Sequence, residues 1–120
     1  MTYQGSFICV GSSHLFLVAA IHNYLWCDYV KSILILSLYI TSVMYHSRPR
    51  KTLKILDCSV CGITAAYGNI YAVNVLPYIF TFLVCLFYFL GNFPENTIKR
   101  HVYHASTVHF IGFLGMLSDC

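Results

Sequence analysis

Charged residues divide the first half of the chain into two apolar segments. Residues 1–27 contain no Asp, Glu, Lys or Arg, and Asp28 and Lys31 mark a short turn after them. Residues 32–47 are again free of acidic and basic side chains, and a polar loop follows over residues 48–54. About 20 consecutive apolar residues are enough for an α-helix to cross the hydrocarbon core of a bilayer. The pattern therefore predicts two membrane-spanning helices joined by a tight turn.

The second half contains a longer uncharged stretch and a final apolar segment. Residues 58–94 carry no formal charge. They are too many for one span, so we expect the chain to turn near residues 74–77, where Pro77 interrupts a helix. Lys99 and Arg100 precede the last segment, residues 101–118. The prediction is an all-α fold, a polytopic transmembrane bundle of about five helices that forms a single domain over residues 1–120.

Composition supports a membrane protein over a soluble one. The chain is 58% hydrophobic and 9% charged, whereas soluble domains carry about 25% charged residues. A soluble fold of 120 residues cannot bury so much apolar surface and still cover itself with polar groups. No basic region precedes the first apolar segment, so we expect this segment to remain as a helix instead of being cleaved as a signal peptide. No phosphate-binding loop or basic–aromatic patch indicates a nucleic-acid partner.

Basic residues predict the orientation of the bundle. With five spans, the loop after the second helix and the loop before the fifth lie on the same side of the membrane. These loops contain six of the seven basic residues, which are Arg48, Arg50, Lys51, Lys54, Lys99 and Arg100. The positive-inside rule places this side, and the N-terminus with it, in the cytosol.

Histidine, aspartate and serine side chains are predicted to meet at that basic side. His46 ends the second helix, Asp57 begins the third, and His101 and His104 begin the fifth. Ser42 lies one turn before His46 on the same face, since residues i and i+4 of a helix are neighbours. Ionisable groups at membrane depth are costly unless they are paired, bound to metal or facing water.

Three imidazoles with an open fourth position suit a catalytic zinc ion, which lowers the pKa of a bound water to about 7. On this hypothesis Asp57 takes the proton from the water and the Ser42 hydroxyl binds the developing oxyanion. The alternative is that the histidines lie among the lipid headgroups and bind water and phosphates there.

Two stretches of the sequence resemble motifs of the CREST superfamily of membrane hydrolases, and most closely those of its Per1-like proteins. "SVMYHSRPRKTLKILD" over residues 42–57 is similar to the Ser-x-x-Phe-His stretch of that family and the Asp that follows it. "YHASTV" over residues 103–108 is similar to its Trp-His-x-Ser-Thr-Ile stretch. Phe93-Pro94 and "FLGMLSD" also have counterparts.

The resemblance implies a zinc-dependent hydrolase that cleaves an acyl ester or amide of a membrane lipid, with remodelling of GPI anchors as the nearest activity. It implies His46 and His104 as zinc ligands, with Asp57 and Ser42 beside them. The first histidine of the family's His-x-x-x-His motif falls on Arg100, so we expect His101 to replace it. His109 is expected to point away from His104 and to be a poorer ligand.

The resemblance also implies a multi-pass protein of the endoplasmic reticulum or Golgi membrane. GPI lipids lie in the lumenal leaflet, whereas the basic loops place the site in the cytosol, and this conflict leaves the lipid unnamed. Family members have seven spans, so a bundle of five leaves the substrate cavity incomplete or completed by a second copy. Small residues of the third helix, Gly62, Ala65, Ala66 and Gly68, permit close helix packing within the chain or in such a homo-oligomer.

Two alternative functions remain open from the sequence. The protein is a shortened, non-catalytic relative, or it is a small haem-binding membrane anchor in which His14 or His22 pairs with His109.

Cys58 and Cys61 form a single CxxC. They are interpreted as packing residues instead of metal ligands, because no second CxxC accompanies them.

Overall fold

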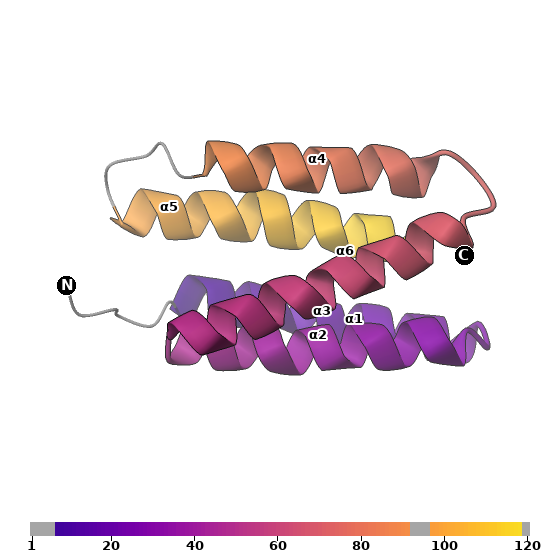
Figure 1. The fold of residues 1–120 in the computed structure, drawn as a ribbon, viewed down its shortest axis with the longest axis horizontal. Coiled ribbons are helices and arrows are strands. Elements are labelled where there is room, and N and C mark those ends of the chain that lie inside the picture. The colour runs from indigo at the N-terminus through magenta and orange to yellow at the C-terminus, as the bar shows by residue number, and fades with distance from the viewer. Residues whose placement is uncertain (1–6, 92–96, 119–120) are drawn as a thin grey trace.

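The computed structural model describes residues 7–91 and 97–118, which form five helical rods (Figure 1). The first four are α1 (Phe7–Leu25), α2 (Tyr29–Ser47), α3 (Lys51–Ile70) and α4 (Leu76–Leu90). The fifth is continuous but contains three parts: α5 (Thr97–Tyr103), the π-helical segment η1 (His104–His109) and α6 (Phe110–Leu117). No strand occurs in the described ranges. The predicted all-α fold of about five helices is confirmed.

The turn between α1 and α2 is fixed by a capping motif at each helix end. Cys27 has a φ of 63°, the left-handed conformation common one residue beyond a helix C-terminus. The amide of Cys27 donates to Tyr24 O at 3.0 Å and that of Asp28 donates to Asn23 O at 3.0 Å. Asp28 then caps α2, because its carboxylate accepts a hydrogen bond from the Lys31 amide at 3.2 Å. Lys31 therefore belongs to the first turn of α2. The sequence analysis had placed it in the connecting turn instead.

Prolines mark the boundary between α2 and α3 and the boundary between α3 and α4. Pro49 lies between α2 and α3, and Pro77 lies in the first turn of α4, where the missing amide hydrogen costs nothing. The helix break expected near residues 74–77 is confirmed. The predicted polar loop over residues 48–54 is shorter than expected, because α3 already begins at Lys51 and Lys54 donates its amide to Arg50 O.

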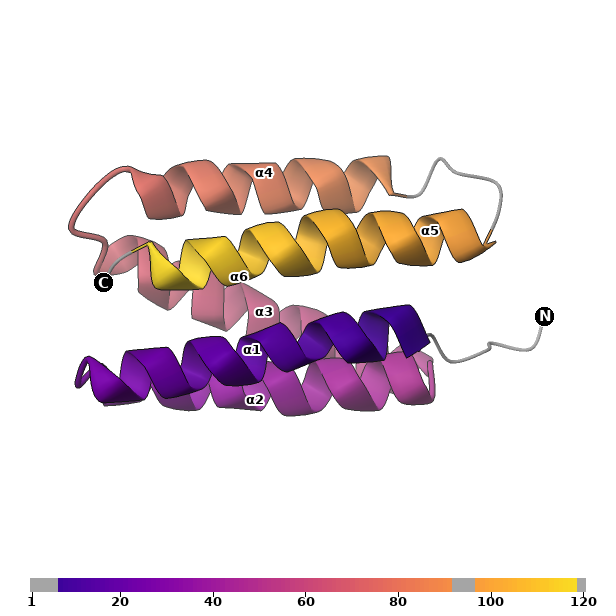
Figure 2. The ribbon, with the colours of Figure 1, turned by 180° about the vertical axis from the view of Figure 1, so that it is seen from behind.

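The rods form two pairs with α3 between them. Figures 1 and 2 show α1 beside α2 on one side of the molecule and α4 beside the last rod on the other. α3 starts next to the end of α2 and crosses the bundle diagonally toward the start of α4. The end of α2, the start of α3 and the start of the last rod consequently lie at the same end of the bundle, as the sequence predicts.

The α1–α2 pair buries polar side chains beside its apolar core and leaves many large apolar side chains exposed. Among the fully buried side chains are Ser13, Asn23 and Ser42, whereas many large apolar side chains are exposed, such as Val18 and Ile33. Small and hydroxyl-bearing residues between helices, with large apolar residues facing outward, are typical of helices that pack in lipid.

Two helices are long and apolar enough to cross a membrane, as judged by length and composition. These are α1 and α2, with 19 residues each. α4 is apolar but has 15 residues, and α3 includes two lysines and an aspartate among its 20 residues. The two long apolar helices indicate membrane association, and the remaining three rods do not independently meet the same criterion.

Candidate metal centre

Three imidazoles from α2 and η1 meet at the end of the bundle where α2 finishes. They belong to His46, His104 and His109, and one ring nitrogen from each lies within 4.8 Å of the other two. His104 Nε2 and His109 Nε2 are 3.0 Å apart. The His46 ring centroid lies 5.1 Å from that of His104 and 5.0 Å from that of His109. Such a cluster can hold a metal ion, because imidazole nitrogens are its preferred neutral ligands.

His109 takes the place that the sequence had assigned to His101. The two candidate ligands of η1 are five residues apart, a spacing that puts them on different faces of an α-helix. A π-helix bonds residue i to residue i+5, and its wider turn brings positions five apart onto one face. The expectation that His109 points away from His104 is therefore wrong. Among the described residues, the three-histidine group does not include His101.

Hydroxyl groups accompany the change from α-helix to π-helix. Ser106 Oγ donates to Val102 O at 2.7 Å, and the Thr107 hydroxyl donates to Tyr103 O. Serine and threonine that bond back to carbonyls of the preceding turn distort helices at such points. Short π-helical segments inside α-helices are frequent at functional sites.

Ser12 of α1 orients the ring of His109. Its Oγ lies 2.6 Å from His109 Nδ1 and donates to Cys9 O at 3.1 Å. Because a hydroxyl has one hydrogen, His109 Nδ1–H is then the donor to Ser12, and the lone pair of His109 is on Nε2. Metal-binding histidines are commonly held in this way by a hydrogen bond from the second ring nitrogen. This role of Ser12 was not predicted, because no sequence motif links it to His109.

His46 presents a buried ring nitrogen that has no hydrogen-bond partner in the part of the chain that the structure describes. This atom is Nε2, and the ring stacks on Tyr45 with a centroid separation of 5.0 Å. A buried polar atom without a partner costs free energy, about 1–3 kcal/mol. A metal ion bound to Nε2 would remove this cost.

The geometry of the group fits zinc after a small contraction. Tetrahedral zinc with Zn–N bonds of about 2.0–2.1 Å places its nitrogen ligands roughly 3.4 Å apart. The His104–His109 pair, at 3.0 Å, would open slightly. The nitrogens of the whole group, which lie within 4.8 Å of one another, would close toward that spacing.

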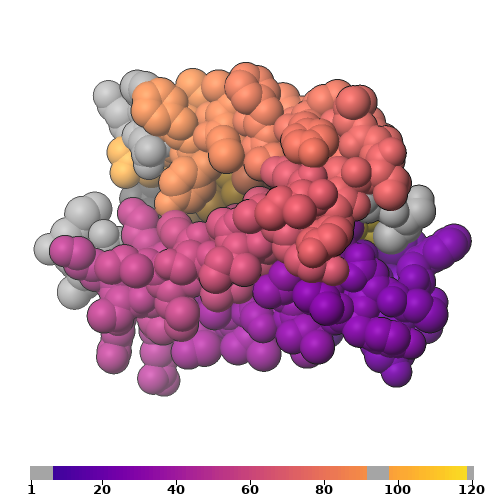
Figure 3. All heavy atoms as spheres, turned by 45° about the vertical axis from the view of Figure 1, so that its right-hand side comes forward, coloured from indigo at the N-terminus to yellow at the C-terminus, as the bar shows by residue number. Residues whose placement is uncertain are grey.

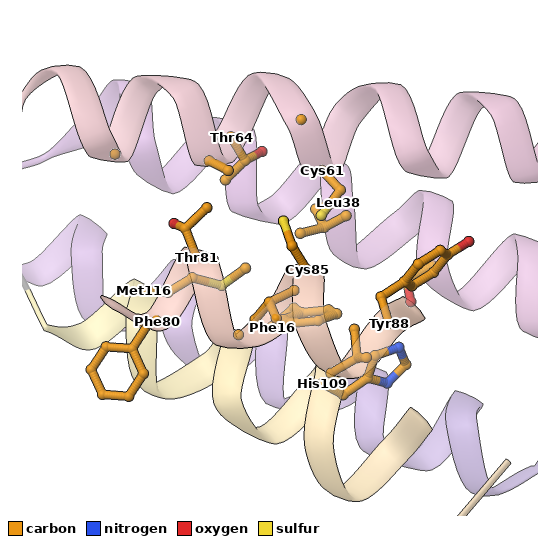
Figure 4. Close-up of a pocket in the computed structure, with 18 of the residues that line it drawn as sticks. Phe16, Leu38, Cys61, Thr64, Phe80, Thr81, Cys85, Tyr88, His109 and Met116 are labelled. Atoms are coloured by element: carbon orange, nitrogen blue, oxygen red, sulfur yellow. The ribbon is translucent and has the colours of Figure 1, made fainter. Parts of the chain in front are cut away.

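A cavity of about 400 Å³ lies between α3, α4 and the last rod, and two members of the three-histidine group, His104 and His109, line one end of it. Figure 4 shows His109 at one end and Met116 at the other, with Cys61 and Thr64 on α3 facing Thr81 and Cys85 on α4. In the space-filling view a recess between α3 and α4 leaves atoms of the last rod visible (Figure 3). The volume lies within the usual range of small-molecule sites.

Asp57 lines this cavity together with His104 and His109. Thr41 Oγ1 donates to Asp57 Oδ1 at 3.0 Å, whereas Oδ2 accepts no hydrogen bond from the described residues. A buried carboxylate with one oxygen free of hydrogen bonds from the described residues suits proton transfer.

Ser42 also lines the cavity, but its hydrogen is already engaged. Ser13 Oγ donates to Cys9 O at 2.6 Å and lies 2.8 Å from Ser42 Oγ. Since Ser13 has one hydrogen, Ser42 is the donor in their bond. The role predicted for Ser42, a hydrogen bond to an oxyanion, therefore requires its hydroxyl to leave Ser13.

The residues of the alternative hypotheses lie apart from the three-histidine group. His14 Nδ1 is 2.9 Å from Tyr39 Oη, on the exposed side of the α1–α2 pair. His22 packs on Trp26 near the α1–α2 turn, at the opposite end of α1. Cys58 and Cys61 are free thiols that line the cavity, and neither is a member of the metal-competent group formed by described residues.

Comparisons of the chain with family models, with curated proteins and with solved structures find no match.

The hydrogen bond from Ser12 to His109 predicts an indirect effect on metal affinity. In Ser12→Ala the ring of His109 loses its partner, and we expect the affinity for a divalent metal ion to fall about 10–100-fold, the usual cost of removing such a bond. Competition with a chromophoric chelator measures this change. Ser37→Ala is the matched control, because Ser37 bonds back to Ile33 O within α2 and away from the histidines. Equal affinities in the two variants would contradict the role of Ser12.

Proposed function

We propose that the protein is a zinc-dependent membrane hydrolase that cleaves an acyl ester or amide bond of a lipid, with all five rods embedded in the membrane. The observation that carries the proposal is that two members of the three-histidine group, His104 and His109, line a largely apolar cavity that Asp57 and Ser42 also line. The sequence resemblance to CREST hydrolases supports the same chemistry, with His109 now in the place of His101.

The apolar cavity suits an acyl chain, and the histidine end suits the bond to be cleaved. A zinc ion held by His46, His104 and His109 would supply Lewis acidity and activate water near neutral pH. Asp57 Oδ2 accepts a proton from the attacking water as its oxygen adds to the acyl carbon. The same proton is then given to the leaving oxygen or nitrogen, so that a fatty acid and an alcohol or amine are the products.

Hydroxyl side chains of α1 and α2 orient the carboxylate and the oxyanion donor that these steps use. Thr41 fixes the carboxylate of Asp57 through Oδ1. Ser42 supplies a hydrogen bond to the oxyanion once its hydroxyl turns away from Ser13, whose own hydrogen stays on Cys9 O. Donors aimed at the developing charge are usually the largest electrostatic contribution to such reactions.

Metal removal and return test the proposed activity. We expect the purified protein to release fatty acid from at least one lipid in a panel of ceramides, lysophospholipids, diacylphospholipids and GPI-type phosphatidylinositols. A strong chelator should abolish the release and added zinc should restore it, because the histidines act through the metal. Mass spectrometry of released fatty acids is the measurement. Zinc-loaded protein that cleaves no member of the panel would support the non-catalytic alternative instead.

A further inference from the structure

The cavity continues well beyond the histidines, to the first turn of α2. Lys31 lines it at this far end, together with Asn69, Pro77 and Met116. Lys31 and Ser42 both lie on α2, about 16 Å apart along the helix axis. The cavity thus has the three-histidine group at one end and an amine at the other.

Lys31 is a largely buried residue, and its ammonium, which keeps some accessible surface, forms no ion pair with the described residues. Its side chain is 4% exposed. The nearest carboxylate in sequence, that of Asp28, accepts hydrogen bonds from the Lys31 backbone amide at 3.2 Å and from Tyr67 Oη at 3.5 Å. It forms no ion pair with the Lys31 ammonium. A buried charge is costly unless an opposite charge pairs with it, so this end of the cavity favours an anion.

The walls between the two ends are apolar. Phe16, Leu38 and Val84 contribute to them, and Gly62 and Gly68 leave open space where larger residues would project. Such walls suit a hydrocarbon chain, because apolar surface is removed from water when the chain enters.

We propose that the cavity binds a single-chain anionic amphiphile, with its anionic group on the ammonium of Lys31 and its hydrocarbon chain directed toward the three histidines. A carboxylate and a phosphate monoester share this chemistry. The anionic group lies at the end remote from the histidines and needs no metal, whereas the hydrocarbon chain occupies the same space as the acyl chain in the proposed hydrolysis.

Binding of three probes with the same hydrocarbon chain tests the proposal. Tritiated palmitate, hexadecyl phosphate and uncharged hexadecanol are titrated against the full chain in neutral maltoside micelles, with scintillation proximity as the readout. We expect at least one of the two anions to bind about tenfold or more tightly than hexadecanol. Preference for palmitate identifies a fatty acid as the ligand, and preference for hexadecyl phosphate identifies a lipid phosphate. Equal binding of all three probes would overturn the proposal.

Charge variants locate the anion. Lys31→Met keeps the length of the side chain and removes its charge, so we expect binding of the preferred anion to fall about tenfold or more, to the level of hexadecanol. Lys31→Arg should retain it. Lys54→Met removes an exposed basic side chain and should leave binding unchanged. Unaltered anion binding in Lys31→Met would refute the assignment.

A steric variant tests whether the chain occupies the cavity. Gly68 lines it, and a side chain there meets open space, so Gly68→Phe should fill the cavity and weaken binding of both anions. Gly11 is also open to added atoms but is not among the lining residues, and Gly11→Phe is the matched control. Equal binding by the two variants would contradict occupancy of this cavity.

Discussion

We expect His109→Gln to lower zinc affinity about a hundredfold or more, and His101→Gln to change it little. Removing a direct ligand should exceed the roughly 10–100-fold cost of disturbing an outer hydrogen bond. Glutamine is close to histidine in size, so the packing of this buried position against Phe16 is largely kept. Chelator competition on detergent-purified variants gives both affinities.

This pair of variants tests whether His109, as in the structure, or His101, as α-helical spacing predicted, is the third metal ligand. An α-helical last rod would bring His101 next to His104 and turn His109 away, and His101→Gln would then be the damaging change. In the π-helical segment η1, His109 lies next to His104 instead, so His109→Gln is expected to be the damaging change. A large loss of zinc in His101→Gln with none in His109→Gln would contradict the three-histidine group.

We expect Asp57→Asn to reduce lipid hydrolysis by about 10²–10⁴-fold, the usual contribution of a general base, without loss of zinc. The amide keeps the shape of the side chain and can still accept the hydrogen bond from Thr41, but it cannot take a proton. Turnover is followed as released fatty acid on the lipid that the wild type cleaves best, and zinc is measured on the same sample.

Thr41→Val is the matched control for this effect. It removes the hydroxyl that donates to Asp57 Oδ1 but retains the carboxylate, so the loss of turnover should be smaller than in Asp57→Asn. Full activity in Asp57→Asn would show that another group receives the proton. Loss of zinc in that variant would place Asp57 among the ligands.

The helices could be predicted because charge and proline mark their ends. Asp28 caps α2, Pro77 opens α4, and the basic residues near position 50 separate α2 from α3. The convergence of His46, Asp57 and His104 at one end of the bundle follows from alternating helix directions alone. Membrane insertion of α3, α4 and the last rod does not follow in the same way, because these rods are shorter or more polar.

Details of the site depended on tertiary structure. Nothing in the sequence distinguishes a π-helical turn at His104 from an α-helical one, so the selection of His109 over His101 could not be anticipated. Ser12 and His109 are 97 residues apart in the sequence. Helix periodicity relates only near neighbours, so it could not predict their contact. Lys31 was expected in the short turn between the first two helices, and its burial within α2 depends on tertiary packing.

The central claim is that His46, His104 and His109 hold one zinc ion. Elemental analysis with an absorption spectrum, on detergent-purified wild type beside His46→Ala, tests it most directly. The account predicts about one zinc per chain in the wild type, bound through three imidazoles, and its loss in the variant. A Soret band with iron would favour the haem anchor. Absence of both metals from the folded wild type, also after incubation with zinc, would contradict the metal centre and leave the three histidines as buried polar residues.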